Sequence, residues 1–161
     1  MLTRHGVIIV TTGYRLGLLG FLCTHDHTSL GNYGLWNQYF ALKFVSDNIT
    51  AFGGNPSNIT MFGQSAGAVS CDLLSISPLS RHLISKVICM GGNCETMWSV
   101  SARPLAAGFC RDLAIKFGYK RKFTGPWSTM ENNEMIAFLK QLPPQKFGKR
   151  FFSVCKNNFL K

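Results

Sequence analysis

The residues best suited to chemistry lie in the pentapeptide Gly63-Gln64-Ser65-Ala66-Gly67, which has the form G-x-S-x-G. In a nucleophile elbow, a serine lies on a strained turn between a strand and a helix, and the two glycines allow neighbouring backbones to approach closely. The amide N–H that follows the serine points to where negative charge develops on an attacked carbonyl. The pentapeptide therefore predicts Ser65 as the nucleophile of an acyl transfer and Ala66 as one oxyanion-hole donor.

The segments on either side have the patterns that such a turn needs. Residues 58–62 predict a short strand, and residues 66–76 predict a helix that ends before Pro78. The alternative is a glycine-flanked structural turn with an ordinary serine. The flanking strand and helix favour the nucleophile.

Strand and helix patterns alternate along much of the chain. Residues 23–33 are polar and rich in turn-forming types, so they predict a surface loop. The predicted strands are 7–12, 58–62 and 86–90, and the predicted helices are 35–48, 66–76, 104–117 and 131–142. This order predicts an α/β fold with a mostly parallel central sheet and flanking helices on both of its faces.

The charge distribution and the cysteine spacing indicate which partners and cofactors the sequence favours. Of the net charge of +10, nine charges come from residues 103–161, where a solvated basic face is expected because no nucleic-acid-binding motif is present. A nucleic-acid-binding segment is the alternative. The six cysteines lack zinc spacing, so no metal or other cofactor is predicted, and the even count permits disulfides without demanding them. Cys71 and Cys89 are expected to be buried thiols. For His25, Asp26 and His27, a solvated loop is preferred to a metal site.

No apolar stretch approaches the roughly 20 residues of a membrane-spanning helix, so no transmembrane segment is predicted. Residues 1–6 lack the features of a signal peptide.

A set of further motifs accompanies the pentapeptide: Tyr14-Arg15-Leu16-Gly17, Gly20-Phe21-Leu22, Gly31-Asn32-Tyr33-Gly34-Leu35, Gln38, Ala41-Leu42, Ala51-Phe52-Gly53-Gly54-Asn55-Pro56, Asn58-Ile59-Thr60, Phe62, Ser77-Pro78 and Trp98. On these residues the sequence resembles the type-B carboxylesterases and cholinesterase relatives of the α/β-hydrolase fold. The resemblance implies hydrolysis of small-molecule carboxylic esters by acyl transfer to Ser65, with Ala66 supplying an oxyanion-hole amide.

The resemblance also implies a domain organisation. Residues 1–161 would form an internal part of a carboxylesterase domain, with the central sheet and elbow in residues 7–100 and a helical, basic tail in 101–161. Gln64 stands where the family commonly has Glu, which should weaken any preference for cationic substrates. Other departures from the usual family residues are Gly13, Asn37, Ala68 and Gly91.

The chain lacks the partners that a catalytic serine needs. A histidine must accept the serine proton and an acid must orient that histidine, and this fold supplies them in the order serine, acid, histidine. After Ser65 the sole histidine is His82, with Asp72 the one acid between them, and His82 comes too early in the chain. We expect His82 to be a surface residue, the catalytic histidine and acid to be absent, the upstream glycine loop to be missing, and this chain to be inactive alone.

A cholinesterase-like adhesion protein is the alternative function, although such proteins usually lack the nucleophile. No partner protein is indicated. Localisation is open, and a secreted or luminal protein is implied by resemblance alone. Asn48-Ile49-Thr50 and Asn58-Ile59-Thr60 match the N-glycosylation pattern, the second as an expected chance match within a strand.

Overall fold

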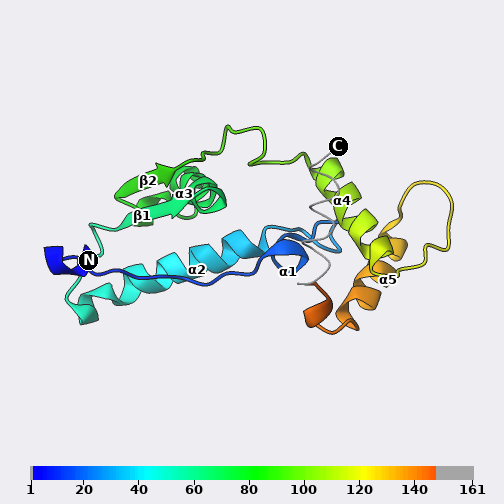
Figure 1. Ribbon diagram of the computed structural model, residues 1–161, viewed down its shortest axis with the longest axis horizontal. Coiled ribbons are helices and arrows are strands. Elements are labelled where there is room, and N and C mark those ends of the chain that lie inside the picture. The colour runs from blue at the N-terminus through cyan, green and yellow to red at the C-terminus, as the bar shows by residue number, and fades with distance from the viewer. Residues whose placement is uncertain (1, 148–161) are drawn as a thin grey trace. The chain divides into compact units, whose positions relative to one another are not determined.

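The computed structural model describes residues 2–147, which fall into two compact units. Unit 1 contains residues up to Tyr14 and Leu35–Ser101, and unit 2 contains Arg15–Gly34 and the described residues from Ala102 onward. Figure 1 labels the α-helices and strands of both units.

Unit 1 is built on two parallel strands, β1 (Thr60–Gln64) and β2 (Lys86–Met90), which pair in register from Thr60 with Lys86 to Gln64 with Met90. Helix α3 (Ala66–Ile76) and the short 3₁₀ helix η3 (Arg81–Leu83) connect them, and α3 packs against both strands (Figure 1). A crossover helix between parallel strands is the arrangement of α/β folds. The predicted fold class is confirmed.

The second face of the strand pair is less covered than the sequence predicts. Phe62 and Ile88 are neighbours in the register, and their exposed fractions are 48% and 53%. Among the described elements, α3 is the helix that packs closely on both strands. The expectation of helices on both faces is therefore wrong for the described part of the chain.

Helix α2 (Tyr33–Asn48) follows the predicted span closely, and a 3₁₀ turn, η2 (Ile49–Phe52), continues it. Gly53 ends this turn with a φ of 81°, in the left-handed region that glycine adopts without strain. From α2, Gln38 Nε2 donates to Ser70 Oγ on α3 over 3.3 Å, and both side chains are buried.

The strand predicted at residues 7–12 is wrong. These residues have no strand assignment, and Val7, Ile8 and Val10 have exposed fractions of 45% to 47%. A β-branched run becomes a strand when a neighbouring backbone pairs with it, and β1 and β2 pair with each other. The described residues contain no third strand to pair with this segment.

Unit 2 contains α1 (Gly17–Phe21), α4 (Arg103–Lys116) and α5 (Thr129–Lys140). The 3₁₀ helix η1 (Leu2–His5) belongs to unit 1. Helices α4 and α5 confirm the predicted helices at 104–117 and 131–142, whereas α1 was not predicted. The core of unit 2 is apolar and comprises Leu18, Cys110, Leu113, Ala114, Phe117, Tyr119, Met135 and Leu139. No described helix is long and apolar enough to span a membrane.

The predicted surface loop at 23–33 is tied to the helices of unit 2. Asp26 accepts hydrogen bonds from Thr24, from the Thr28 backbone and from Asn132 Nδ2 on α5, the last over 2.9 Å. Burial alone would raise the pKa of the Asp26 carboxyl, but these hydrogen bonds outweigh it and hold the pKa well below its usual range. His25 and His27 are exposed, as the solvated-loop interpretation predicts.

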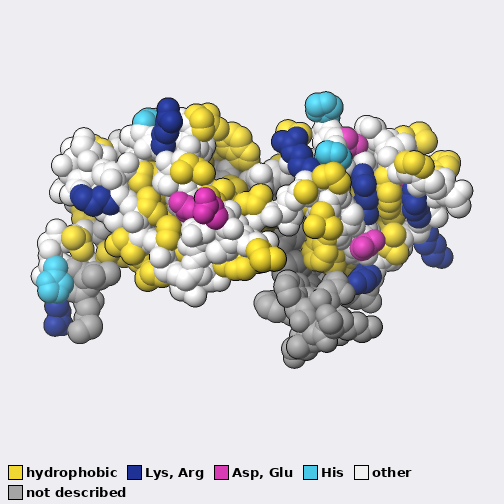
Figure 2. All heavy atoms as spheres, turned by 90° about the horizontal axis from the view of Figure 1, so that it is seen from above, with side chains coloured by type: hydrophobic (Ala, Val, Ile, Leu, Met, Phe, Trp, Pro, Cys, Tyr) yellow, Lys and Arg dark blue, Asp and Glu magenta, His cyan; other side chains and the backbone are white. Residues whose placement is uncertain are grey.

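Part of the predicted basic face is engaged in ion pairs. Arg121 donates to Glu131 over 2.8 Å and lies over the Trp127 ring, with the Glu131 side chain 1% exposed. Lys122 pairs with Glu134 at a more exposed position. Figure 2 shows Lys and Arg side chains at the surface among apolar and acidic ones. The second basic cluster, from Lys146, lies largely outside the described residues.

Asn132 offers a test of the loop attachment. It is 2% exposed, donates to Asp26 and accepts from Arg111 Nε over 3.3 Å. We expect Asn132→Ala to lower the free energy of unfolding in urea by about 2–3 kcal/mol, because two charged groups each lose a buried partner.

Asn133→Ala is the matched control, because Asn133 is exposed on the same helix and should change stability by less than about 0.5 kcal/mol. The difference between the variants should be present above pH 4 and shrink as the pH falls below it, since the Asp26 pKa is lowered on folding. Equal effects at both positions would contradict this attachment.

Candidate active site

Ser65 lies on the turn that joins β1 to α3. Its φ is 54° and its ψ is −121°, a conformation that non-glycine residues rarely adopt. The Ser65 N–H donates to the Met90 carbonyl over 2.9 Å, which extends the strand pairing, and its carbonyl accepts from the Val69 N–H over 3.1 Å. The chain must therefore pass from strand to helix within this one residue.

Gly63 provides the space that this sharp turn requires. A Cβ at Gly63 would lie 2.4 Å from the backbone carbonyl carbon and oxygen of Gly67 and 2.9 Å from the amide nitrogen of Ala68. A side chain here would collide with the first turn of α3. Close backbone approach therefore accounts for glycine at this position.

The same reasoning is wrong for Gly67. Apart from its chain neighbours and the backbone of its own helix, a Cβ at this position would meet no described atom within 4 Å. Gly67 lies within α3, where the N-terminal turn faces Gly63 through its backbone. The space for a side chain is therefore restricted at Gly63, on the strand, and not at Gly67, on the helix.

Ser65 stands at the carboxyl ends of both strands, the edge at which parallel sheets bind ligands. Its side chain is half-buried and does not cap α3. Ala66 is the first residue of α3, so its N–H has no acceptor within the helix and lies at the positive end of the helix dipole. The arrangement has the geometry for a nucleophile and one oxyanion donor, and both roles stay predictions.

Three residues to which the sequence assigned no role at the site help to position this turn. Met90 accepts the Ser65 N–H, and a Cβ at Gly92 would lie 2.9 Å from the Ser65 carbonyl oxygen and 3.1 Å from the Trp98 ring. The segment after β2 therefore packs against the serine backbone. Two features of the sequence could have indicated this packing. They are the Gly91-Gly92 pair at the end of a predicted strand and the tryptophan at position 98.

His82 is placed far from Ser65 by the strand register. Ser85 donates its N–H to Ile59, so η3 lies at the amino ends of the strands, whereas Ser65 lies at the carboxyl ends. A five-residue strand separates these edges by about 16 Å. His82 is exposed, as predicted for a surface histidine.

Asp72 has a structural role in the described chain. Its carboxylate accepts the Cys94 N–H over 2.8 Å, and this hydrogen bond lowers the pKa of Asp72. No described histidine hydrogen-bonds to Asp72 or Ser65. The described residues thus bring together Ser65 and Ala66 without a catalytic acid and base.

The cysteines also have structural surroundings. Cys71 is buried as predicted, and burial raises the pKa of its thiol. The prediction that Cys89 is buried is wrong: it lies on the sparsely covered strand pair and is exposed. The described residues contain no group of three potential metal ligands.

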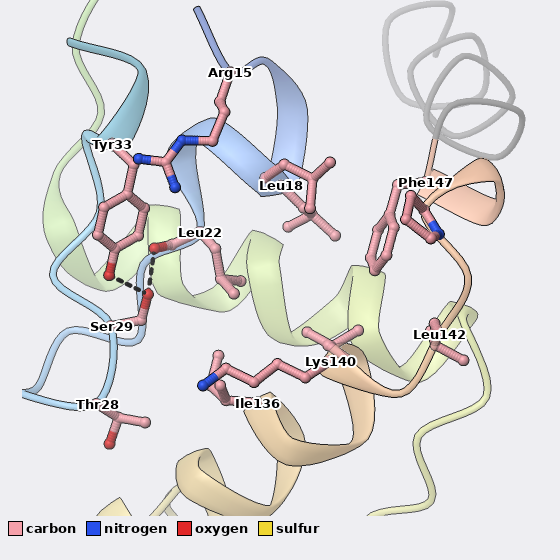
Figure 3. A pocket seen from close by; sticks show the side chains of 13 residues that line it. Arg15, Leu18, Leu22, Thr28, Ser29, Tyr33, Ile136, Lys140, Leu142 and Phe147 are labelled. Carbon is pink, nitrogen blue, oxygen red and sulfur yellow. Dashed lines mark hydrogen bonds between the residues drawn. The ribbon is translucent and has the colours of Figure 1, made fainter. Parts of the chain in front are cut away.

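A pocket of about 360 Å³ lies within unit 2, and its lining includes no residue of the Ser65 turn. Figure 3 shows Arg15 beside the Tyr33 ring, and the Tyr33 hydroxyl lies 3.0 Å from Ser29 Oγ. Leucines, Ile136 and Phe147 supply much of the remaining lining. Its lining contains no carboxylate, histidine or cysteine, so it offers neither a thiol nor a histidine–carboxylate pair, and its titratable side chains are Arg15, Tyr33 and Lys140.

Comparison with known proteins decides the family. Residues 1–160 match the model of the carboxylesterase family. The chain belongs to the carboxylesterase family. This confirms the resemblance to the type-B carboxylesterases, and the α/β-hydrolase fold class agrees with the parallel pair of strands.

The relatives of this carboxylesterase-family chain include both enzymes and a neuroligin. Bile salt-activated lipase of Mus musculus is 44% identical over 143 residues, which are 89% of this chain and 22% of the lipase. Esterase cest-33 of Caenorhabditis elegans is 44% identical over 137 residues, 83% of this chain and 25% of the esterase. Neuroligin-2 of Homo sapiens is 47% identical over 140 residues, 87% of this chain and 16% of the neuroligin. The chain spans a quarter or less of the length of these curated relatives.

The two glycines of the pentapeptide should respond differently to alanine. We expect Gly63→Ala to lower the free energy of unfolding by about 3 kcal/mol or more, because its Cβ meets backbone that cannot move without disturbing α3.

Gly67→Ala is the control with the same chemical change. Apart from its chain neighbours and its own helix, its Cβ meets nothing described, and alanine favours the helix by up to about 1 kcal/mol, so stability should stay equal or rise. Urea unfolding of both variants measures the difference. Equal losses at the two positions would contradict the turn geometry.

Proposed function

We propose that Ser65 is the nucleophile of a carboxylic ester hydrolase in the full-length protein. The observation that carries the proposal is the strained backbone of Ser65, with its φ of 54°, at the carboxyl edge of a parallel strand pair. Strain of this kind persists where the surrounding structure determines it and is typical of functional sites. Membership of the carboxylesterase family supports the same chemistry.

In the proposed reaction, Ser65 Oγ attacks the ester carbonyl carbon and the carbonyl oxygen becomes an oxyanion. The Ala66 N–H, at the N-terminus of α3, donates to that oxyanion. Collapse of the tetrahedral intermediate releases the alcohol and leaves an acyl group on Ser65. Water then hydrolyses the acyl-enzyme and restores the serine.

The proposed mechanism needs a base to accept the Ser65 proton and an acid to orient that base. His82 is at the wrong edge of the strands, and Asp72 is hydrogen-bonded to the Cys94 backbone. We therefore assign the histidine, the acid and the second oxyanion donor to residues beyond those described, and we expect the 161-residue chain alone to have no esterase activity above background.

Gln64 bears on the proposed substrate. It is exposed at the end of β1 next to Ser65 and carries no charge. A glutamate at this position would attract a cationic alcohol group, so we propose that neutral esters are preferred to choline-type esters. Which acyl chain is accepted depends on pocket walls beyond the described turn.

An adhesion or binding role is the second candidate, because neuroligin-2 is among the relatives. The presence of a serine in the strained position favours the hydrolase. Nucleic-acid binding has less support, because Arg121 and Lys122 pair with Glu131 and Glu134. A secreted or luminal location stays a proposal from family resemblance.

A fluorophosphonate probe tests the nucleophile directly. We expect the full-length protein to be labelled with a stoichiometry near one, with Ser65 as the modified residue, because the probe reacts with activated serines. Ser65→Ala should lose at least about 95% of the labelling, and kcat for a p-nitrophenyl ester should fall by about 10³-fold or more.

Ser101→Ala is the control, since Ser101 is an exposed serine outside helix and strand and should leave labelling unchanged. Equal labelling of Ser65→Ala and the wild-type protein would exclude Ser65 as the nucleophile. A folded, unlabelled wild-type protein would favour the binding role.

A further inference from the structure

Two cysteines that are distant in sequence lie in contact within unit 2. The Cys23 N–H donates to Cys110 Sγ over 3.4 Å, although the residues are 87 positions apart. Both are buried, with exposed fractions of 9% and 3%, and both are free thiols. A sulfur so close to the backbone of a second cysteine is within reach of that residue's own sulfur.

Neighbouring residues hold the two cysteine backbones together. Arg111, which follows Cys110 on α4, donates from Nη2 to the carbonyl of Thr24, which follows Cys23, over 2.9 Å. Asn132 on α5 holds the same loop through Asp26 over 2.9 Å. A disulfide requires Cα atoms about 4.4–6.8 Å apart, and this pairing of adjacent residues keeps the two backbones close.

The other described cysteines have different contacts. Cys89 Sγ donates to the Ala68 carbonyl over 3.5 Å, and the Cys94 backbone is bound to Asp72. Cys71 interacts electrostatically with Cys89. In the described residues, the hydrogen bond from the Cys23 N–H to Cys110 Sγ joins two cysteines that lie on separate segments of unit 2.

We propose that Cys23 and Cys110 are an oxidation site at which a disulfide links the loop after α1 to helix α4. The oxidant is a low-molecular-weight disulfide such as oxidised glutathione. The thiolate of Cys23, the more exposed residue, attacks one oxidant sulfur and expels a glutathione thiolate. Cys110 then loses its proton to solvent, attacks the Cys23 sulfur and expels the second glutathione from the mixed disulfide. Two protein thiols are oxidised, and one glutathione disulfide is reduced to two thiols.

The structure explains how such a link would act. Burial raises the pKa of the Cys110 thiol, and the hydrogen bond from the Cys23 N–H only partly offsets this shift. A raised pKa disfavours the thiolate, so Cys110 is poorly suited to the first attack and is left for the second, intramolecular step. The two chain segments of unit 2 are separated by residues 35–101. A link between them would close a long loop that contains Ser65 and would restrict the unfolded chain.

Peptide mapping tests the proposal on the full-length protein. The protein is equilibrated with oxidised glutathione, treated with N-ethylmaleimide and digested without reduction by trypsin and a glutamate-specific protease. This digestion isolates Cys23 and Cys110 as the single cysteines of residues 16–43 and 96–111. We expect these two peptides to be joined by a disulfide, and addition of dithiothreitol to lower Tm by about 5 °C.

Three variants complete the test. Cys23→Ser and Cys110→Ser should abolish the linked peptide and the response of Tm to dithiothreitol, whereas Cys94→Ser should keep both. The wild-type map decides the matter if a variant fails to fold. Residues 16–43 and 96–111 recovered with both cysteines blocked by maleimide, or joined to other cysteines, would overturn the proposal.

Discussion

The backbone of Ser65 belongs at once to a strand and to a helix, and the candidate site depends on this double role. Its N–H continues the pairing of β1 with β2, and its carbonyl accepts the hydrogen bond from Val69 in the first turn of α3. A positive φ allows the chain to make both bonds without an intervening loop. The glycine at position 63 follows from this constraint, because the helix begins where a strand side chain would project. The serine side chain and the Ala66 N–H are then left at the edge where parallel strands end.

Unit 2 depends on contacts between segments that are far apart in sequence. Asp26 and Asn132, 106 positions apart, are joined by a charge-assisted hydrogen bond, and Arg111 binds both Thr24 and Asn132. These polar contacts lie beside an apolar core from α1, α4 and α5. The loop after α1 thus has a defined conformation, and the same contacts bring Cys23 to Cys110.

Local patterns predicted the elements whose partners are near in sequence. Strand 86–90 and helix 66–76 match β2 and α3, because the apolar faces that define them pack against each other within one strand–helix–strand unit. The predicted strand at 7–12 failed because a strand also needs a neighbouring backbone, which its own residues do not specify. Helix α1 is only five residues long and was not predicted. Cys89 was misjudged because its Sγ reaches the Ala68 carbonyl of α3 and the residue still stays exposed on β2, which among the described strands is paired along one edge only. The position of Ser65 between strand and helix could be predicted from the pentapeptide, whereas the roles of Met90 and Gly92 depend on the register of β1 with β2.

The most direct measurement of the proposed chemistry is a crystal structure of the full-length protein after reaction with an organophosphonate, which mimics the tetrahedral intermediate. We expect a bond from phosphorus to Ser65 Oγ, a phosphoryl oxygen within hydrogen-bonding distance of the Ala66 N–H, and a positive φ at Ser65. An adduct on another residue, or a phosphoryl oxygen directed away from the N-terminus of α3, would contradict the proposed chemistry.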